Sequence, residues 1–209
     1  VPFKDIQIQL VDLPPVSREY CESFVFDNIK ASDGALLMID LVSGDPVHDL
    51  NQTLELLKEK KIYLVPPQGK PENPELGIAY IQALLLLNKC DQDPEGELLE
   101  LVREMIETDL PIRVISAQKR IGMETLAQDM FDLLRVIRVY SKQPGKPPDL
   151  DAPFTTAIGT TVIDFAGMVH KDFADQLKEA RVWGSARFDG QVVQRDYVLH
   201  DGDIVELSI

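Results

Sequence analysis

The stretch Tyr80-Ile81-Gln82-Ala83-Leu84-Leu85-Leu86-Leu87-Asn88-Lys89-Cys90-Asp91 decides how this 209-residue sequence is interpreted. Its apolar run predicts a buried strand that leads directly into an amide, an ammonium and a carboxylate. A carboxylate at Asp91 can accept two hydrogen bonds, from the ring N–H and the exocyclic amine of guanine, whereas adenine lacks this pair of donors. The aliphatic stem of Lys89 can lie along the base, and Asn88 can tie neighbouring loops together. The stretch therefore predicts a site that selects guanine.

A second strand-then-loop segment follows downstream. A short apolar strand at Val114-Ile115 leads into Ser116, Ala117 and Gln118. The small side chains of Ser116 and Ala117 would let the backbone approach a flat base closely. The Ala117 N–H is placed to donate to a purine carbonyl, so this loop is expected to brace the same base.

A third segment of this kind lies near the start of the sequence. Residues Ile6–Leu13 read as a strand that ends in Asp12 and continues into Pro14-Pro15. Open α/β sheets bind their ligands at the carboxyl ends of parallel strands. We therefore expect all three loops to lie at one edge of a parallel sheet.

Helical segments alternate with the strands, as a doubly wound sheet requires. Helices are expected from Ser17 to about Ala31, from Asp45-Pro46, from Asp93-Pro94 and over residues 126–137, and further strands at Gly34–Asp40 and Ile62–Val65. The apolar stripes of these helices predict core faces that pack on the sheet. The fold class is therefore α/β, with a mostly parallel sheet and flanking helices.

The composition changes after Arg135. A capping box, Thr161 with Asp164, starts a short helix, and Ala180–Phe188 reads as a strand followed by the two-residue turn Asp189-Gly190. With a closing strand over 204–209, this region predicts a small β-grasp domain. Trp183 is expected to fill its core, the alternative being that it stacks on a base or sits in a partner's groove.

With these motifs in place, the sequence resembles a translation-associated GTPase of the Obg-related, developmentally regulated GTP-binding (DRG-like) type. In that family Asn-Lys-x-Asp is the guanine-specificity motif and Ser-Ala-x braces the base. These motifs fall here on Asn88, Lys89 and Asp91, and on Ser116, Ala117 and Gln118. The resemblance implies GTP or GDP and Mg²⁺ as cofactors, with Asp12 holding the metal through water.

The C-terminal region also matches that family. Gly159–Val162, Val182–Gly184 and Asp201–Val205 resemble a TGS domain, the small module with which DRG-like GTPases end. The resemblance implies a partial GTPase domain over residues 1–137 and a TGS-like domain over residues 138–209.

The sequence departs from the family in its phosphate-binding parts. No Gly-x-x-x-x-Gly-Lys-[Ser/Thr] occurs in it, so the P-loop that wraps phosphates with backbone N–H groups is missing, as is the first switch. Pro15 occupies the glycine of the Asp-x-x-Gly switch motif, and proline has no N–H to donate to a γ-phosphate. We expect a GTPase whose first third is absent, and no general base can be assigned.

The amino-acid composition argues against some classes of function. The net charge is −14 and most of the acidity falls in residues 1–137, which argues against a general nucleic-acid-binding surface. No apolar run is long enough to span a bilayer, and Cys21 and Cys90 are expected to be reduced thiols. These features indicate a cytoplasmic protein without a membrane partner.

Two classes of function stay open. In the first, the chain is the C-terminal part of a GTP-hydrolysing switch that acts near the ribosome, with hydrolysis depending on a P-loop supplied by the parent protein. In the second, the chain is a non-hydrolysing binding module whose TGS domain contacts RNA, the ribosome or a regulatory protein.

Overall fold

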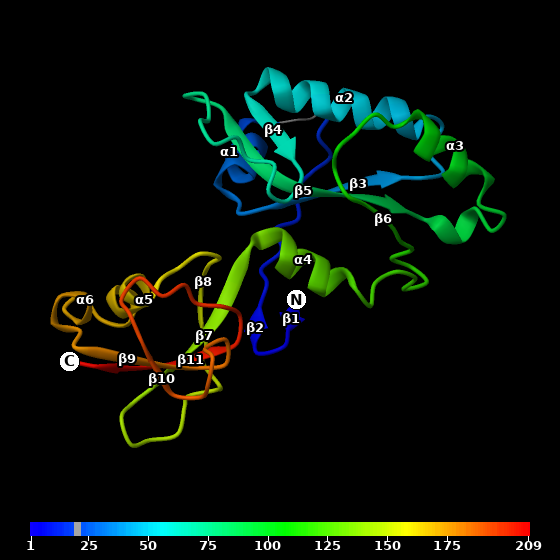
Figure 1. Cartoon of the computed structure of the whole chain (residues 1–209). Coiled ribbons are helices and arrows are strands. Elements are labelled where there is room, and N and C mark those ends of the chain that lie inside the picture. The colour runs from blue at the N-terminus through cyan, green and yellow to red at the C-terminus, as the bar shows by residue number, and fades with distance from the viewer. Residues whose placement is uncertain (19–21) are drawn as a thin grey trace. The chain divides into compact units, whose positions relative to one another are not determined.

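The computed structural model describes residues 1–18 and 22–209, and the chain divides into two compact units (Figure 1). Unit 1 consists of Val1–Ile8 together with Arg135–Ile209, and unit 2 of Gln9–Leu134. The division near residue 135 falls where the composition changes. The grouping of Val1–Ile8 with the C-terminal unit is a feature that the sequence did not indicate.

Unit 2 is built on a parallel sheet of four strands, β3 (Ala35–Asp40), β4 (Ile62–Val65), β5 (Ala79–Asn88) and β6 (Ile112–Val114). The central strand β5 pairs with β3 from Ala83 to Asn88. On its other edge β5 pairs first with β4 and then, nearer its carboxyl end, with β6. Since all pairs are parallel, the carboxyl ends of β3, β5 and β6 lie at the same edge of the sheet.

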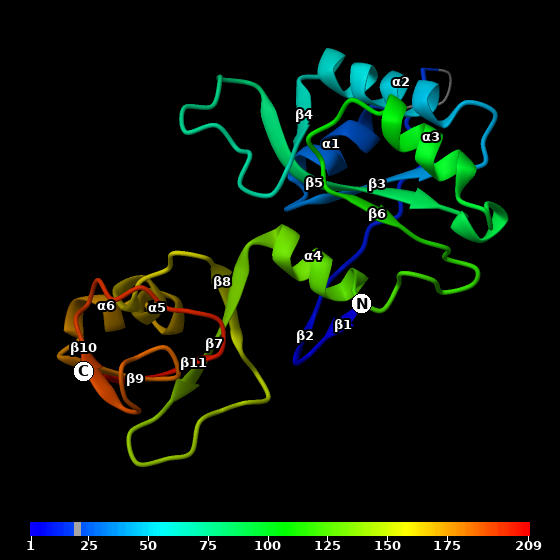
Figure 2. The same cartoon turned by 45° about the vertical axis from the view of Figure 1, so that its right-hand side comes forward.

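Four helices cover this sheet: α1 (Ser23–Ala31), α2 (Pro46–Glu59), α3 (Glu97–Met105) and α4 (Leu126–Leu134). Ala83, Leu85 and Leu87 of β5 are buried in one cluster with residues of α2 and α3. The alternate residues Leu84 and Leu86 are also buried, and α4 lies on that face (Figure 2). Burial on both faces explains why β5 reads as a continuous apolar run. The expected α/β class with a parallel sheet is confirmed.

One of the predicted helix starts agrees with the structure, and two lie a few residues too early. Asp45 caps α2 as predicted, because its carboxylate accepts the His48 N–H at 2.9 Å and Pro46 follows it. The helix predicted from Asp93-Pro94 begins at Glu97 instead, although Asp93 still accepts the Leu99 N–H at 2.8 Å. The helix expected from Ser17 begins at Ser23, and Cys21 lies outside the described residues.

The apolar stripe of α3 is only partly buried. Val102 lies in the core, but Leu101 and Met105 are 53% and 54% exposed. The prediction that these two side chains pack on the sheet is therefore wrong. Both lie one helical turn apart on the outer side of α3, since residues i and i+4 share a face.

Unit 1 contains a five-stranded sheet in the order β10 (Gln191–Val193), β9 (Glu179–Trp183), β11 (Asp203–Ser208), β7 (Val136–Lys142) and β8 (Phe154–Ala157). β7 and β11 are parallel and the other pairs antiparallel. The helices α5 (Val162–Val169) and α6 (Phe173–Gln176) follow β8. The predicted capping box of Thr161 and Asp164 is present at the start of α5. Phe165 of α5 is fully buried in the core of this unit.

Trp183 does not fill that core. Ala180 and Val182 are the core residues of β9, and the alternation of a strand turns Trp183 to the opposite face. There the ring is partly exposed, with the Lys142 ammonium 4.8 Å from its centroid. A turn is present at Asp189-Gly190, where the Gln191 N–H donates to the Phe188 carbonyl at 3.2 Å, but the predicted strand Ala180–Phe188 ends at Trp183, so the turn does not join β9 directly to β10.

The N-terminal residues form a short hairpin instead of the expected long strand. β1 (Pro2–Phe3) and β2 (Ile6–Gln7) pair antiparallel, and no strand continues through residues 8–13. The predicted strand Ile6–Leu13 is therefore wrong, and Asp12 does not follow a strand of the parallel sheet. None of the helices in the described part of the chain has the length and apolarity needed to cross a bilayer.

Candidate guanine-binding site

The loops that follow β5 and β6 lie side by side at the carboxyl edge of the sheet. Leu87 and Val114 are register partners, and beyond them the Ile115 N–H donates to the Leu87 carbonyl at 2.8 Å. The Cys90 N–H in turn donates to the Ile115 carbonyl at 3.2 Å. These bonds bring the Asn88 loop against the Ser116 loop, which is the arrangement expected for the two base-contacting segments.

Asn88 connects the two loops directly. Its side-chain Oδ1 accepts a hydrogen bond from the Ala117 N–H at 3.0 Å. The bond agrees with the expected role of Asn88 in tying neighbouring loops. It also means that the Ala117 N–H, which we expected to donate to a purine carbonyl, here donates to Asn88.

Lys89 occupies a left-handed backbone conformation, with φ of 68°. Its ammonium forms an ion pair with Asp40 Oδ2 at 2.5 Å, which links the β5 loop to the end of β3. Asp40 is a residue that the sequence reasoning missed. Its position as the last residue of a buried strand was the available signal, but nothing in the sequence pairs it with a lysine 49 residues away.

One carboxylate oxygen of Asp91 has an unusual environment. Its Oδ1 is buried and has no hydrogen-bond partner, one of two such side-chain oxygens among the described residues. Buried carboxylate oxygens are nearly always satisfied, because losing hydration without a replacement bond is costly. An unpartnered acceptor at this position is compatible with a ligand that brings N–H donors. The guanine edge is such a ligand.

The thiol of the adjacent Cys90 is unreactive at neutral pH. Burial, together with the negative charge of Asp91, raises the pKa of the Cys90 thiol. The thiol therefore stays protonated at neutral pH and is a poor nucleophile.

The second loop is held tightly from within. Ser116 is buried and exchanges two backbone hydrogen bonds with Ile121, at 3.0 and 3.1 Å. Its Oγ accepts the Lys119 N–H at 3.0 Å, whereas Ala117 and Gln118 are exposed at the tip. The loop thus presents a small, rigid surface on which a flat ring can rest.

Gly122 closes this loop in a conformation that few other residues adopt. Its φ is +68°, and a Cβ added there would lie 2.5 Å from the Val114 carbonyl oxygen. We expect Gly122→Ala to lower the free energy of unfolding of unit 2 by about 2 kcal/mol through strain and steric conflict. Urea unfolding followed by far-UV circular dichroism measures this change.

Gly44→Ala is the matched control, because Gly44 has nothing within 4 Å of an added Cβ and no positive φ. Its effect should stay within about 0.5 kcal/mol. Equal effects of the two substitutions would show that the Gly122 turn does not hold the loop.

Asp12 stands apart from these residues. It is exposed and lies in the irregular segment between β2 and α1, as does Pro15. Among the described residues no three His, Cys, Asp or Glu side chains gather as metal ligands. The structure thus adds no second ligand to support a magnesium role for Asp12, which stays a prediction.

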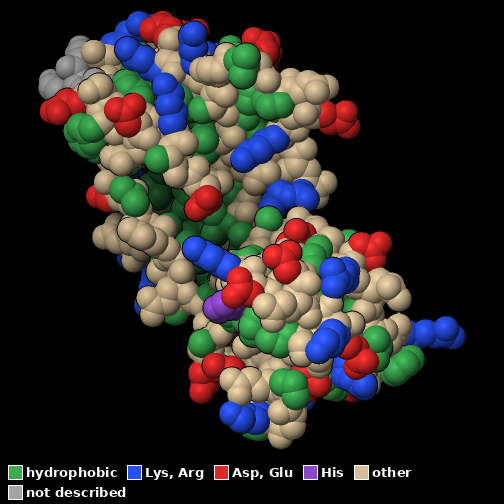
Figure 3. Space-filling model, turned by 90° about the vertical axis from the view of Figure 1, so that its left-hand side faces the viewer, with side chains coloured by type: hydrophobic (Ala, Val, Ile, Leu, Met, Phe, Trp, Pro, Cys, Tyr) green, Lys and Arg blue, Asp and Glu red, His purple; other side chains and the backbone are tan. Residues whose placement is uncertain are grey.

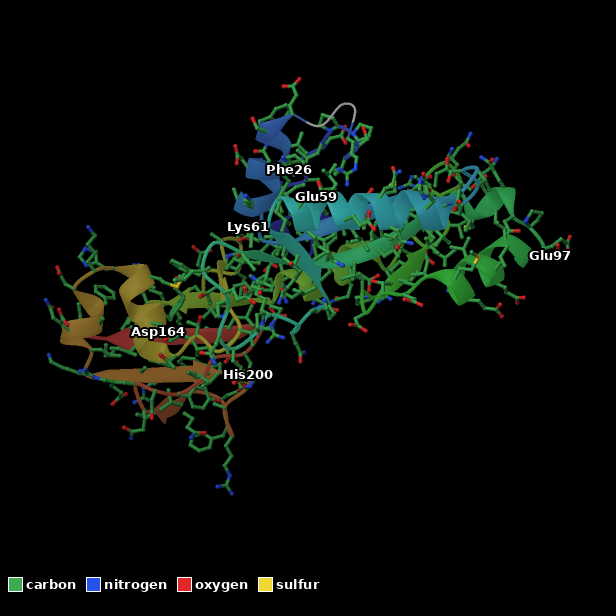
Figure 4. The ribbon with its side chains drawn as sticks, turned by 90° about the horizontal axis from the view of Figure 1, so that it is seen from above. Phe26, Glu59, Lys61, Glu97, Asp164 and His200 are labelled. Atoms are coloured by element: carbon green, nitrogen blue, oxygen red, sulfur yellow. The ribbon has the colours of Figure 1, made fainter. Side chains whose placement is uncertain are left out.

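One group of basic residues in unit 2 lies away from this edge, whereas Lys89 and Lys119 belong to its two loops. Lys58, Lys60 and Lys61 mark the carboxyl end of α2, where cations complement the helix dipole, and the Lys60 ammonium lies 5.4 Å from the centre of the Phe26 ring. Figure 4 shows Lys61 at one end of unit 2 and Glu97, at the start of α3, at the other. Because the Lys61 carbonyl accepts the Ala79 N–H at the start of β5, this basic group lies at the end of the strand opposite to the candidate site.

Comparison with known proteins identifies the C-terminal region. A TGS domain model matches residues 137–209. Over 131 residues the chain is 36% identical to an uncharacterized GTP-binding protein of Methanocaldococcus jannaschii, covering 62% of this chain and 34% of that protein. Over 130 residues it is 32% identical to developmentally-regulated GTP-binding protein 1 of Xenopus laevis, covering 61% of this chain and 34% of the relative.

Solved structures agree on the fold. A GTP binding protein from Pyrococcus horikoshii OT3 superposes with a TM-score of 0.61 at 17% identity, covering 89% of this chain and 81% of that one. The YchF GTPase of Schizosaccharomyces pombe gives 0.59 at 14% identity, covering 89% and 75%. The chain spans about a third of the length of the curated relatives it matches. Residues 137–209 thus match the TGS domain family, and over about 130 residues the chain is similar in sequence to developmentally regulated GTP-binding proteins.

Proposed function

We propose that unit 2 carries the guanine-reading part of a GTPase of the Obg/DRG type. The base would lie at the sheet edge between the Asn88 and Ser116 loops. Asp91 would accept from the ring N–H and exocyclic amine, while the stem of Lys89 covers one side of the ring. Ser116, Ala117 and Gln118 would brace the other side. The observation that carries the proposal is the buried, unpartnered Oδ1 of Asp91 beside two loops bonded to each other.

This sequence contains no recognisable motif for binding the phosphates of the nucleotide. No P-loop motif occurs in it, and Pro15 has no N–H for a γ-phosphate. Hydrolysis would depend on positioning and charge stabilisation supplied by a phosphate-binding loop and Mg²⁺ in the parent protein, with Asp12 as the water-mediated metal residue. We place this activity in the cytoplasm, in association with translation, as the family resemblance implies.

A nuclear magnetic resonance titration tests base recognition without requiring tight binding. GDP at millimolar concentration should shift the amide resonances of Lys89, Asp91 and Ala117, because the base contacts these loops. ADP at the same concentration should leave them unchanged, since adenine lacks the donor pair that Asp91 needs. Equal shifts with both nucleotides would show that the loops do not read guanine.

Affinity gives a second prediction. We expect residues 1–209 to bind GTP more weakly than micromolar, because most of the affinity for a nucleoside triphosphate comes from phosphate contacts. Isothermal titration calorimetry with GTP measures this directly. A dissociation constant in the micromolar range or tighter would mean that other groups in the chain hold the phosphates.

A second candidate function is supported by the outer face of the TGS sheet. Trp183 and Lys142 stack there in partial exposure, and Phe188 in the following loop is exposed. Figure 3 shows Lys and Arg side chains among acidic and hydrophobic ones on one side of the molecule. A non-hydrolysing module could use such a face for RNA, the ribosome or a protein partner. Loss of ribosome co-sedimentation in Trp183→Ala, with GDP shifts retained, would favour this alternative.

A further inference from the structure

Arg138 of β7 is the centre of a charged cluster within unit 1. Its side chain is 9% exposed, and it bonds Asp201 through Nε at 3.0 Å and Nη2 at 2.8 Å. The third nitrogen, Nη1, donates to Asp5 Oδ1 at 2.6 Å. The guanidinium thus holds two carboxylates, one from the TGS domain and one from the N-terminal hairpin.

Asp5 is bonded on both of its oxygens. The hydroxyl of Tyr140, two residues along β7 from Arg138, donates to Asp5 Oδ2. Burial alone would raise the pKa of Asp5, but the hydrogen bonds from Tyr140 and Arg138 outweigh it and lower the pKa below its ordinary value. The carboxylate is therefore charged, and the contact complete, throughout the neutral pH range.

The hairpin depends on this contact for its order. β1 and β2 pair over only two residues each, closed by bonds between Val1 and Ile8. Two-stranded hairpins are marginally stable in water on their own. The hairpin is therefore held by Asp5 together with the buried side chains of Phe3 and Ile8.

Asp5 and Arg138 lie on opposite sides of unit 2 in the sequence. Asp5 lies three residues before Ile8, after which unit 2 begins, and Arg138 lies three residues after Arg135, where unit 1 resumes. The Asp5–Arg138 pair therefore closes a loop of 133 positions that contains the whole of unit 2. One end of unit 2 is joined to β7 by the chain itself, and the other end is joined to β7 through the hairpin.

We propose that Asp5, Arg138 and Tyr140 form a releasable latch that ties the N-terminal end of unit 2 to the TGS domain. Release would free the hairpin, while the peptide bond between residues 134 and 135 keeps the two units covalently joined. Arg138 would remain paired with Asp201 after release, so the buried guanidinium keeps a counter-charge and the TGS domain stays folded. The latch does not depend on nucleotide binding.

Asp5→Asn tests the latch, because the amide keeps the shape of the side chain but loses its charge. Hydrogen–deuterium exchange of the full chain, followed by mass spectrometry, should show residues 1–8 exchanging at least about tenfold faster than in the wild type. Peptides from β11 in the same sample should be unchanged. Asp189→Asn, an exposed acid of unit 1, is the matched control and should change neither region.

Two further measurements sharpen the outcome. Trypsin should cleave after Lys4, an exposed turn residue, faster in Asp5→Asn than in the wild type. Tyr140→Phe, which removes one of the two donors to Asp5, should give a smaller acceleration in the same direction. Unchanged exchange of residues 1–8 in Asp5→Asn would overturn the latch. Faster exchange in β11 as well would overturn its releasable character, because Asp5 would then support the whole domain.

Discussion

Asp91→Asn should reverse the base preference of unit 2 from guanine to xanthine. An asparagine amide offers one donor and one acceptor where the carboxylate offers two acceptors, and xanthine presents a carbonyl where guanine carries its amine. Loss of a charge-assisted pair of bonds costs about 3 kcal/mol, or roughly 100-fold in affinity. In the titration described above, the response to GDP should disappear and a response to XDP should replace it.

Asp109→Asn is the control, since Asp109 is an exposed acid of the same unit outside both loops. It should retain the wild-type response to GDP and give none to XDP. If Asp91→Asn keeps the wild-type selectivity, Asp91 does not read the base, and the unpartnered Oδ1 requires another explanation.

Phe165→Ala should be the most destabilising single change in unit 1. Phe165 is fully buried at the centre of α5, and its ring meets that of Phe154 edge-on, with centroids 5.3 Å apart. Truncating a buried phenylalanine removes apolar contacts and leaves a cavity, at a cost of about 3–5 kcal/mol. Trp183 is the only tryptophan and belongs to unit 1, so its fluorescence in a urea titration follows this unit selectively.

Phe188→Ala provides the comparison within the same unit, because the Phe188 side chain is 63% exposed. Its effect should stay within about 0.5 kcal/mol. A midpoint for Phe165→Ala that coincides with that of Phe188→Ala would show that the α5 core does not determine the stability of the TGS domain.

The candidate base-binding edge was predictable from the sequence because its signals are local. The apolar run before Asn88 is buried on both faces in β5, and such a run is typical of a central strand in a parallel sheet. The Ser116 loop was recognisable from the small and polar residues that follow Val114-Ile115. Their adjacency then follows from parallel pairing, which places successive strand ends at one edge.

The features that sequence did not reveal depend on distant partners. The ion pair of Lys89 with Asp40 and the bonds of Asp5 to β7 join residues 49 and more than 130 positions apart. Asp12 was misplaced because the alternating pattern of residues 6–13 resembles a strand, yet only Ile6 and Gln7 find a pairing partner. The prediction for Trp183 was wrong because the alternation of β9 places Ala180 and Val182 in the core and Trp183 on the opposite face.

The arrangement of unit 2 between Ile8 and Arg135 has a practical consequence for protein engineering. The paired atoms of Asp5 and Arg138 are 2.6 Å apart, and three extended residues on either side reach only about 10 Å each. A glycine–serine bridge of roughly eight residues could therefore replace residues 9–134. The resulting miniprotein, residues 1–8 spliced to 135–209, should fold by itself and carry an ordered N-terminal hairpin.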